Sequence, residues 1–227
     1  MNKIKNMLVA VIAITFLSTN AFAGNFGLGV TGSIAVIEGV GTESETANTG
    51  TENSVRTANA SNNAAIGSLF AEYTFESIGG LTFGVDYIPG SADVNSKKMT
   101  RTNVTAAALE TNQQDGDSTA QATVENHLTY YVEVPVHAGL YGKLGYVEMD
   151  VITAETMPGT SGTYGNTSTN GYTYGIGYKN EIGASTYYKV EGTTTEFDTI
   201  SLASGTTNTI KADLDVTKLT FALGYKF

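Results

Sequence analysis

Apolar and polar residues alternate with a period of two in eight separate segments of this chain. In residues 219–227, for example, large apolar side chains occupy every second position and small or polar ones lie between them. Successive side chains of a β-strand point to opposite faces, so the pattern indicates strands with one apolar face. We expect strands at residues 26–36, 66–75, 81–87, 127–134, 140–151, 171–179, 186–200 and 210–227.

The connections between these segments alternate between long and short. Three connections are short turns, and a short turn joins neighbouring antiparallel strands as a hairpin. Long loops on one side and tight turns on the other are typical of bacterial transmembrane barrels, whereas a soluble β-sandwich has no reason to keep this order. We therefore predict an all-β fold, an eight-stranded antiparallel up-and-down transmembrane β-barrel, with four long polar extracellular loops at about residues 37–63, 90–126, 156–170 and 201–208.

Two of the predicted strands change the parity of their apolar positions. In the segment 140–151 the apolar positions pass from Leu144 to Val147, and in the last segment they change between Val216 and Leu219. An extra residue in one strand would shift every later side chain to the other face, so we interpret the first change as a β-bulge.

Residues 1–23 have the features of a secretory signal peptide. Two lysines precede an apolar stretch at residues 7–17, and Ala21-Phe22-Ala23 supplies the small residues of a cleavage site. A membrane-spanning helix needs roughly 20 apolar residues, about twice this stretch. We therefore expect export, cleavage after Ala23 and a mature outer-membrane β-barrel domain at residues 24–227.

The composition excludes several classes of function. The formal net charge of −10 becomes −12 when the two lysines of residues 1–23 are removed, and an acidic chain does not suit nucleic acid, which needs a basic surface. The chain has no cysteine, so neither disulfides nor thiol chemistry is available to it.

The inward faces of the predicted strands carry opposite charges on opposite halves of the barrel. Acidic residues come from the second to fourth strands and lysines from the fifth to seventh, while the last strand is expected to contribute only the neutral Thr220, Ala222 and Gly224. An eight-stranded barrel has room for side chains but hardly for an open channel, and unpaired buried charges are costly. We predict a lumen plugged by ion pairs, which either only satisfy one another or also gate conduction; the network comprises Glu72, Asp86, Glu133, Lys143, Lys179, Lys189 and Glu191.

Other candidate chemistry is weak. His127, Thr129 and Glu125 supply an imidazole, a hydroxyl and a carboxylate, but no nucleophile motif surrounds them, and a triad is defined by geometry. Asp115 and Asp117 lack the remaining spacing of a calcium loop. We expect no enzyme activity, no catalytic residue, no bound metal and no cofactor.

Three motifs carry a family resemblance: the cleavage site, the segment Tyr141-Gly-Lys-Leu-Gly-Tyr146 and the terminal LTFALGYKF. Through them the whole mature chain resembles the small eight-stranded outer-membrane barrels, represented by the transmembrane domain of outer membrane protein A and the opacity-like surface proteins. The resemblance implies periplasmic chaperones and the barrel-assembly machinery as partners during biogenesis. The assembly signal that this machinery recognises would comprise Phe221, Leu223, Tyr225 and Phe227.

Two functions stay open for such a barrel in the outer membrane of a Gram-negative cell, where it would contact lipid. The first is a structural and surface-interaction role, in which the polar acidic loops meet an extracellular ligand that the sequence does not identify. The second is a narrow porin-like channel for small solutes.

Overall fold

The computed structural model describes residues 24–45, 54–94, 99–103, 116–156, 164–204 and 208–227. The predicted signal peptide and Asp115 lie outside these residues. Within them, none forms a helix long and apolar enough to cross a membrane.

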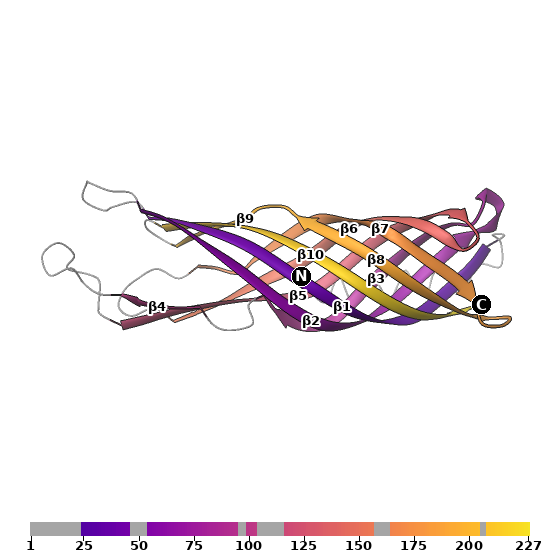
Figure 1. Cartoon of the computed structure of the whole chain (residues 1–227), viewed down its shortest axis with the longest axis horizontal. Coiled ribbons are helices and arrows are strands. Elements are labelled where there is room, and N and C mark those ends of the chain that lie inside the picture. The colour runs from indigo at the N-terminus through magenta and orange to yellow at the C-terminus, as the bar shows by residue number, and fades with distance from the viewer. Residues whose placement is uncertain (1–23, 46–53, 95–98, 104–115, 157–163, 205–207) are drawn as a thin grey trace, which may run out of the picture.

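Eight long strands form a closed antiparallel barrel, drawn in Figure 1. They pair in the order β1-β2-β3-β5-β6-β7-β8-β10, and β10 pairs with β1 to close the sheet. The predicted fold class is confirmed. The bounds of the eight strands are β1 Gly24–Glu45, β2 Ser54–Phe75, β3 Leu81–Asp93, β5 Gly116–His137, β6 Leu140–Thr156, β7 Thr167–Glu181, β8 Thr186–Phe197 and β10 Asn208–Lys226.

The strands run well into the segments that we predicted to be long loops. β1 and β2 pair without interruption from Gly24 and Phe75 to Glu45 and Ser54, so most of the predicted loop 37–63 is a paired ribbon, and β10 also pairs with β1 as far as Glu45. Two short strands, β4 Met99–Asn103 and β9 Ile200–Ser204, lie in the same region and pair antiparallel with β5 and β10. The prediction failed here because backbone pairing continues where neither face of a strand needs to be apolar.

Short turns connect the strands at the end of the barrel opposite these extended strands, and we call it the turn end. The 3₁₀ turn η1 Glu76–Ile78 joins β2 to β3, and Gly79 and Gly80 follow it with φ of 75° and 83°. Only glycine adopts such angles readily, so these two residues permit the tight reversal. The other end, with the projecting β1–β2 ribbon, is called the outer end (Figure 1).

The bulge predicted in residues 140–151 is wrong. β6 pairs with β7 without a register shift, and Val147 and Val151 lie buried on the same inward face as Tyr141. The irregularity lies instead in β5, between Glu125 and Leu128, where the register with β6 shifts. The apolar positions of β6 change parity because the apolar residues nearer the turn end face the lipid, whereas those nearer the outer end face the barrel interior.

These inward apolar side chains form a core in the outer half of the barrel. β10 contributes to it in the same way as β6, since its register with β1 is continuous through the parity change near Val216. We call this group the outer apolar core; its buried members are Ile37, Val147, Met149, Val151, Phe197, Ile200 and Leu214.

The outward face carries an apolar band between two girdles of aromatic residues. On β10 the band runs from Asp215 to Tyr225, ten positions that span roughly 33 Å of strand. At a tilt of about 40° this corresponds to about 25 Å along the barrel axis, the height expected of a membrane barrel. The girdles comprise Tyr87, Tyr130, Tyr146, Tyr172 and Tyr174 toward the outer end, and Tyr73, Phe75, Phe83, Tyr178, Tyr188, Tyr225 and Phe227 at the turn end.

The lipid band predicts a depth-dependent effect of charge on β10. Leu219 is 61% exposed in the middle of the band, so Leu219→Arg should lower the free energy of unfolding by about 2–4 kcal/mol. Asp215→Arg, on the same face beside Glu38 and Glu196, should change it by about 0–1 kcal/mol. Urea unfolding in lipid vesicles measures both, and equal losses would contradict the position of the band.

Candidate functional site

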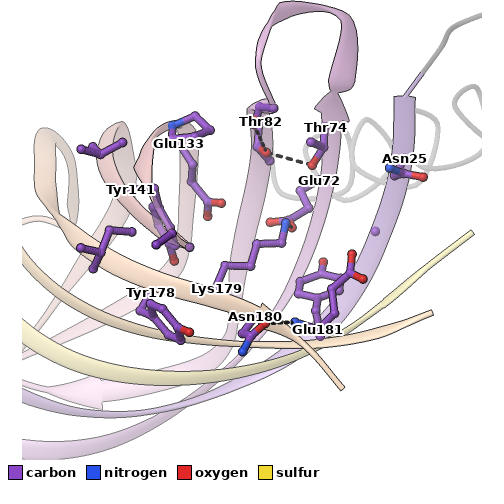
Figure 2. Close-up of a pocket in the computed structure, with 18 of the residues that line it drawn as sticks. Asn25, Glu72, Thr74, Thr82, Glu133, Tyr141, Tyr178, Lys179, Asn180 and Glu181 are labelled. Atoms are coloured by element: carbon purple, nitrogen blue, oxygen red, sulfur yellow. Dashed lines mark hydrogen bonds and ion pairs between the residues drawn. The ribbon is translucent and has the colours of Figure 1, made fainter. Parts of the chain in front are cut away.

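A vestibule of about 420 Å³ occupies the turn end of the barrel interior (Figure 2). Its wall includes the turn residues Ala138 and Gly139 and the last residues of β7, Asn180 and Glu181. Its inner end is formed by Glu72, Glu133 and Lys179. The charged residues predicted for the lumen therefore begin where this vestibule ends.

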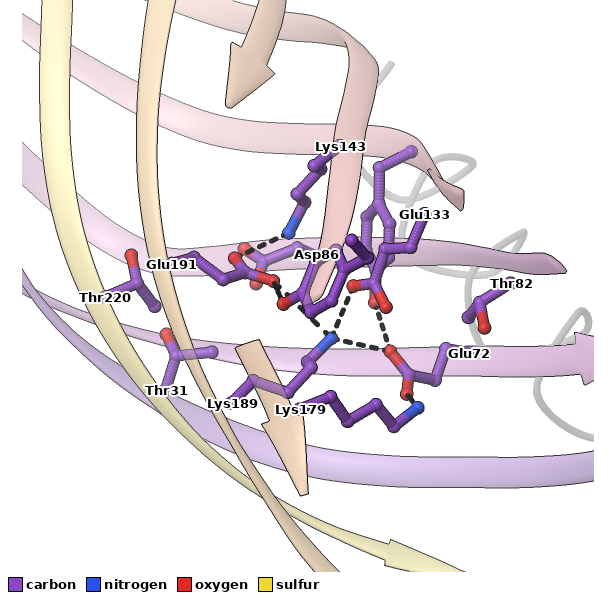
Figure 3. A network of polar contacts seen from close by, with 12 residues as sticks. Thr31, Glu72, Thr82, Asp86, Glu133, Lys143, Lys179, Lys189, Glu191 and Thr220 are labelled. Atoms are coloured by element: carbon purple, nitrogen blue, oxygen red, sulfur yellow. Dashed lines mark hydrogen bonds and ion pairs between the residues drawn. The ribbon is translucent and has the colours of Figure 1, made fainter. Parts of the chain in front are cut away.

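Lys189 stands at the centre of these charges (Figure 3). Its Nζ lies 2.7 Å from Glu72 Oε2, 2.6 Å from Glu133 Oε1 and 3.7 Å from Glu191 Oε1. The Lys189 side chain is only 2% exposed. A buried ammonium needs partners for each of its three N–H donors, and three carboxylates surround this one.

Two further lysines complete the charge balance. Lys179 Nζ lies 2.7 Å from Glu72 Oε1, and Lys143 Nζ lies 2.8 Å from Glu191 Oε2. Three ammonium groups thus face three carboxylates, with no net charge left over. We call these six residues the lysine–glutamate plug: Glu72, Glu133, Lys143, Lys179, Lys189 and Glu191.

Strand register explains why the six side chains meet. Glu133 and Lys143 are direct cross-strand partners on β5 and β6, which favours their attraction. Lys179 and Lys189 are also direct partners, on β7 and β8, where like charges repel. Both of these lysines reach across the lumen to Glu72 on β2, so the closure of the barrel compensates their repulsion.

Asp86 does not join the plug, although we predicted it there. Its Oδ2 accepts a hydrogen bond of 2.8 Å from Ser68 Oγ, and no described lysine lies within 4.0 Å of it. Asp86 pairs with Phe70 on β2, two positions beyond the Glu72–Gly84 pair. It therefore belongs to the next inward layer toward the outer end, a layer of hydroxyl side chains that includes Thr31, Ser33, Ser68, Thr129, Thr173, Thr193 and Thr220.

Two tyrosines support the plug, which we did not predict. Tyr131 Oη donates to Glu72 Oε2 at 2.8 Å, and Tyr141 Oη donates to Glu191 Oε1 at 2.6 Å. Lys143 Nζ also lies 4.1 Å from the centroid of the Tyr131 ring, within reach of a cation–π attraction. Their inward parity was visible in the sequence, but no local signal indicated which carboxylate each would contact.

Inward glycines make room for these rings. A Cβ on Gly84 would lie 2.2 Å from Cζ of Tyr131, and one on Gly177 would lie 2.3 Å from Cζ of Tyr141. Each ring covers the bare backbone of a glycine on a neighbouring strand. The paired glycine and tyrosine thus fill the lumen at the level of the plug.

Directly beyond the plug, at the level of the hydroxyl layer, lies a small polar cavity of about 20 Å³. That volume holds about one water molecule. Lys143 and Glu191 line this cavity, while Glu72, Glu133 and Lys179 line the vestibule. Among the described residues none lines both spaces, so the plug separates the vestibule from the outer half.

The residues predicted as an assembly signal lie on the outward face of the terminal strand. Phe221, Leu223, Tyr225 and Phe227 are between 44% and 64% exposed. The backbone N–H of Phe227 donates to the carbonyl of Phe26 at 2.9 Å, which ties the last residue to the first strand. Their recognition by the assembly machinery stays a prediction.

His127 does not form part of a catalytic triad in the described part of the chain. It faces inward on β5 beside Ile88, and its ring lies 6.5 Å from that of Phe197. Its Nδ1 is buried without a hydrogen-bond partner, so no carboxylate orients the imidazole through this atom.

Lys218 is an inward charge that the sequence analysis missed. We expected the last strand to contribute no charge, because the parity change near Val216 and Leu219 obscured which residues point inward. The continuous register of β10 with β1 instead places Lys218 on the inward face with Thr220, where it lines the polar cavity.

Comparisons with known proteins place these features in a wider context. A family model described as "Outer membrane protein beta-barrel domain" matches residues 9–227. No curated protein matches the sequence.

Several solved structures are similar to this chain at low sequence identity. Neisserial surface protein A is 13% identical, with 86% of this chain and 97% of that one covered and a TM-score of 0.37. The outer membrane protein OprG from Pseudomonas aeruginosa is 12% identical, with 91% and 97% covered and a TM-score of 0.44. The outer membrane protease OmpT from Escherichia coli is 12% identical, with 92% and 99% covered and a TM-score of 0.47.

The plug predicts a strong dependence of stability on charge balance. Lys189→Met leaves three buried carboxylates with two lysines and should lower the free energy of unfolding by about 3–5 kcal/mol. Lys211→Met, an exposed position on β10, should change it by less than about 0.5 kcal/mol.

A second substitution separates lost charge balance from lost packing. Lys189→Met combined with Glu133→Gln restores neutrality and should be more stable than Lys189→Met alone. Urea unfolding followed by the heat-dependent gel shift measures all four proteins. A double variant no more stable than the single one would contradict the role of charge balance.

Proposed function

The chain belongs to the outer membrane protein beta-barrel domain family, and on this premise we propose that it is a closed barrel of the outer membrane whose role is exercised at the cell surface. The single observation that carries this proposal is the neutral plug of three lysines and three glutamates across the lumen. A surface role needs a rigid scaffold, and an interior filled with paired charges provides one.

The packing of the plug argues against a channel for solutes. The side chains of Glu72, Glu133 and Lys189 are only 1–3% exposed, so the plug leaves no open path along the barrel axis. A passage would require several of these ion pairs to open at once, and each separated charge would lose its partner in a site of low polarity. The narrow channel that the sequence left open is therefore the less favoured function.

The outer end supplies the surface for this role. The β1–β2 ribbon continues past Glu38, so residues 39–45 and 54–60 project beyond the lipid band. Binding usually resides in segments held on a rigid scaffold. Acidic side chains also lie on the outward face of the barrel toward the outer end: Glu38, Glu148, Asp150, Glu196, Asp213 and Asp215. We propose that the extracellular ligand meets this acidic, threonine-rich end.

We propose that biogenesis depends on the terminal strand near the turn end. With Phe221, Leu223, Tyr225 and Phe227 exposed on the terminal strand, the barrel-assembly machinery would have an apolar edge to recognise before β10 pairs with β1. The proposal includes no catalytic step, no metal and no cofactor.

Conductance tests whether the lumen is closed. The purified wild-type barrel in a planar lipid bilayer should show no large, persistent open state. The quadruple variant Glu72→Ala, Glu133→Ala, Lys179→Ala and Lys189→Ala removes two charges of each sign from the plug, leaves Lys143 paired with Glu191 and should conduct, provided that its heat-dependent gel shift shows a folded barrel. A persistent open state in the wild type would instead favour the channel for small solutes.

Cysteine labelling tests which end faces the outside. Because the chain has no cysteine, Asn59→Cys on the β1–β2 ribbon and Ala184→Cys in the turn between β7 and β8 each introduce a single thiol. In intact cells a maleimide-polyethylene glycol too large for porins should label Asn59→Cys only. Labelling of Ala184→Cys without permeabilisation would contradict the proposed orientation.

A further inference from the structure

The barrel wall contains an opening between β2 and β3. Backbone pairing of these strands runs from Phe75 and Leu81 to Leu69 and Tyr87 and then stops, although both strands continue toward the outer end. Farther along, Asn62 Nδ2 donates to the carbonyl of Asp93 at 2.8 Å and joins the strands again. The wall between these two connections lacks strand pairing, and we call this gap the window.

The sequence of β3 explains why pairing stops there. Pro89 has no backbone N–H to donate, and Gly90 follows it with φ of 99°. The register of β3 with β5 shifts between Ile88 and Ser91, the mark of a β-bulge. A bulge bends its strand, and here the bend carries β3 away from β2.

A cavity of about 120 Å³ lies behind the window. Residues 65–67 of β2 and 88–92 of β3 line it from the two edges of the window, and members of the outer apolar core line it from inside. An apolar cavity of about 150 Å³ accommodates benzene, so this one suits a group of a few heavy atoms. Its apolar lining includes Ile37, Met149, Phe197, Leu214 and Val216.

Besides Glu125, two nitrogen-bearing residues interrupt this apolar lining. Lys218 lines both this cavity and the small polar cavity next to it. The carboxylate of Asp86 also lines the polar cavity and attracts Lys218, but no described carboxylate lies within 4.0 Å of the Lys218 Nζ. His127 also lines the cavity, and its Nδ1 is buried without a hydrogen-bond partner. A cation and an unpartnered imidazole nitrogen in an apolar cavity are unfavourable unless a ligand satisfies them.

We propose that this cavity binds the carboxylate of an amphipathic monocarboxylic acid, a medium-chain fatty acid, whose tail leaves through the window into the lipid. Lys218 would donate a charge-assisted hydrogen bond to the carboxylate, and His127 would donate a second in the tautomer with a proton on Nδ1. A bound carboxylate would give Lys218 a direct contact in addition to the more distant Asp86, and it would give His127 Nδ1 the partner that it lacks.

The depth of the window favours lipid as the source of the acid. Residues 65–67 of β2 pair with residues 32–34 of β1, where Ile34 is 66% exposed on the lipid-facing side. This level lies four to six positions inside Glu38, near the middle of the apolar band, since Ile34 pairs with Leu219. The lysine–glutamate plug lies nearer the turn end, so the site is a binding site that leaves the closed lumen intact, and it does not depend on the role of the outer end.

Photolabelling tests the site directly. The full barrel is placed in phosphatidylcholine vesicles with decanoate that carries a diazirine on a carbon close to its carboxylate, and the labelled residues are mapped by mass spectrometry. We expect labels on inward residues of the cavity such as Met149 and Val216, saturable by unlabelled decanoate. Labels confined to outward residues such as Leu219 would show bilayer contact only and would overturn the proposal.

Matched variants test the two polar contacts. Lys218→Met should weaken decanoate binding at least about tenfold, because a charge-assisted hydrogen bond is lost. Lys211→Met, an exposed lysine on the same strand, should leave binding unchanged. Val216→Phe fills the cavity and should abolish specific labelling while the heat-dependent gel shift still shows a folded barrel.

Two competitors test the chemistry and the source of the ligand. Decanol lacks the charge and should compete at least about tenfold more weakly than decanoate; equal competition would overturn the role of Lys218. Pentanoate stays largely in water, so competition by decanoate preloaded in the vesicles but not by pentanoate supports access from lipid. Effective competition by pentanoate would overturn the window as the route.

Discussion

Closure of β10 onto β1 is the constraint on which the rest of this structure depends. Inside a bilayer no water satisfies the N–H and C=O groups of an open sheet edge, so every strand must have a partner on both sides. The pairing of Gly27 with Lys226 through Glu45 with Asn208 provides this along the whole of β1. It also defines the interior, because eight strands enclose a space that side chains can fill.

The interior is organised in layers, each with its own way of avoiding unsatisfied groups. At the turn end the lysine–glutamate plug balances its charges within itself and receives two tyrosine hydroxyls. A layer of hydroxyl groups follows, in which Ser33 and Thr220 lie 2.8 Å apart. Toward the outer end the outer apolar core needs no polar partner at all. Lys218 and His127 lie where the second layer meets the third, and there the polar groups are not fully provided with partners.

The barrel wall contains both continuous and interrupted backbone pairing. Between β1 and β2 the ladder is unbroken over both strands, while between β2 and β3 it stops at Leu69 and Tyr87. Pro89 and Gly90 locate this break at the point where an apolar cavity with an unpaired cation lies behind the wall. The closed lumen and the open wall lie at different heights, so one barrel can exclude solutes along its axis and still admit a lipid-borne acid from the side.

Periodicity in the sequence determined the number of long strands and the barrel class. It also determined which residues of the terminal strand face lipid and six of the residues that meet in the lumen, because side-chain direction in a strand is a local property. The tertiary structure decided which carboxylate each lysine contacts and separated Asp86 from the plug. It also decided that the side chains of Val147, Val216 and Lys218 point inward. Register and closure bring together side chains far apart in the chain, and alternation alone carries no information about their height in the barrel.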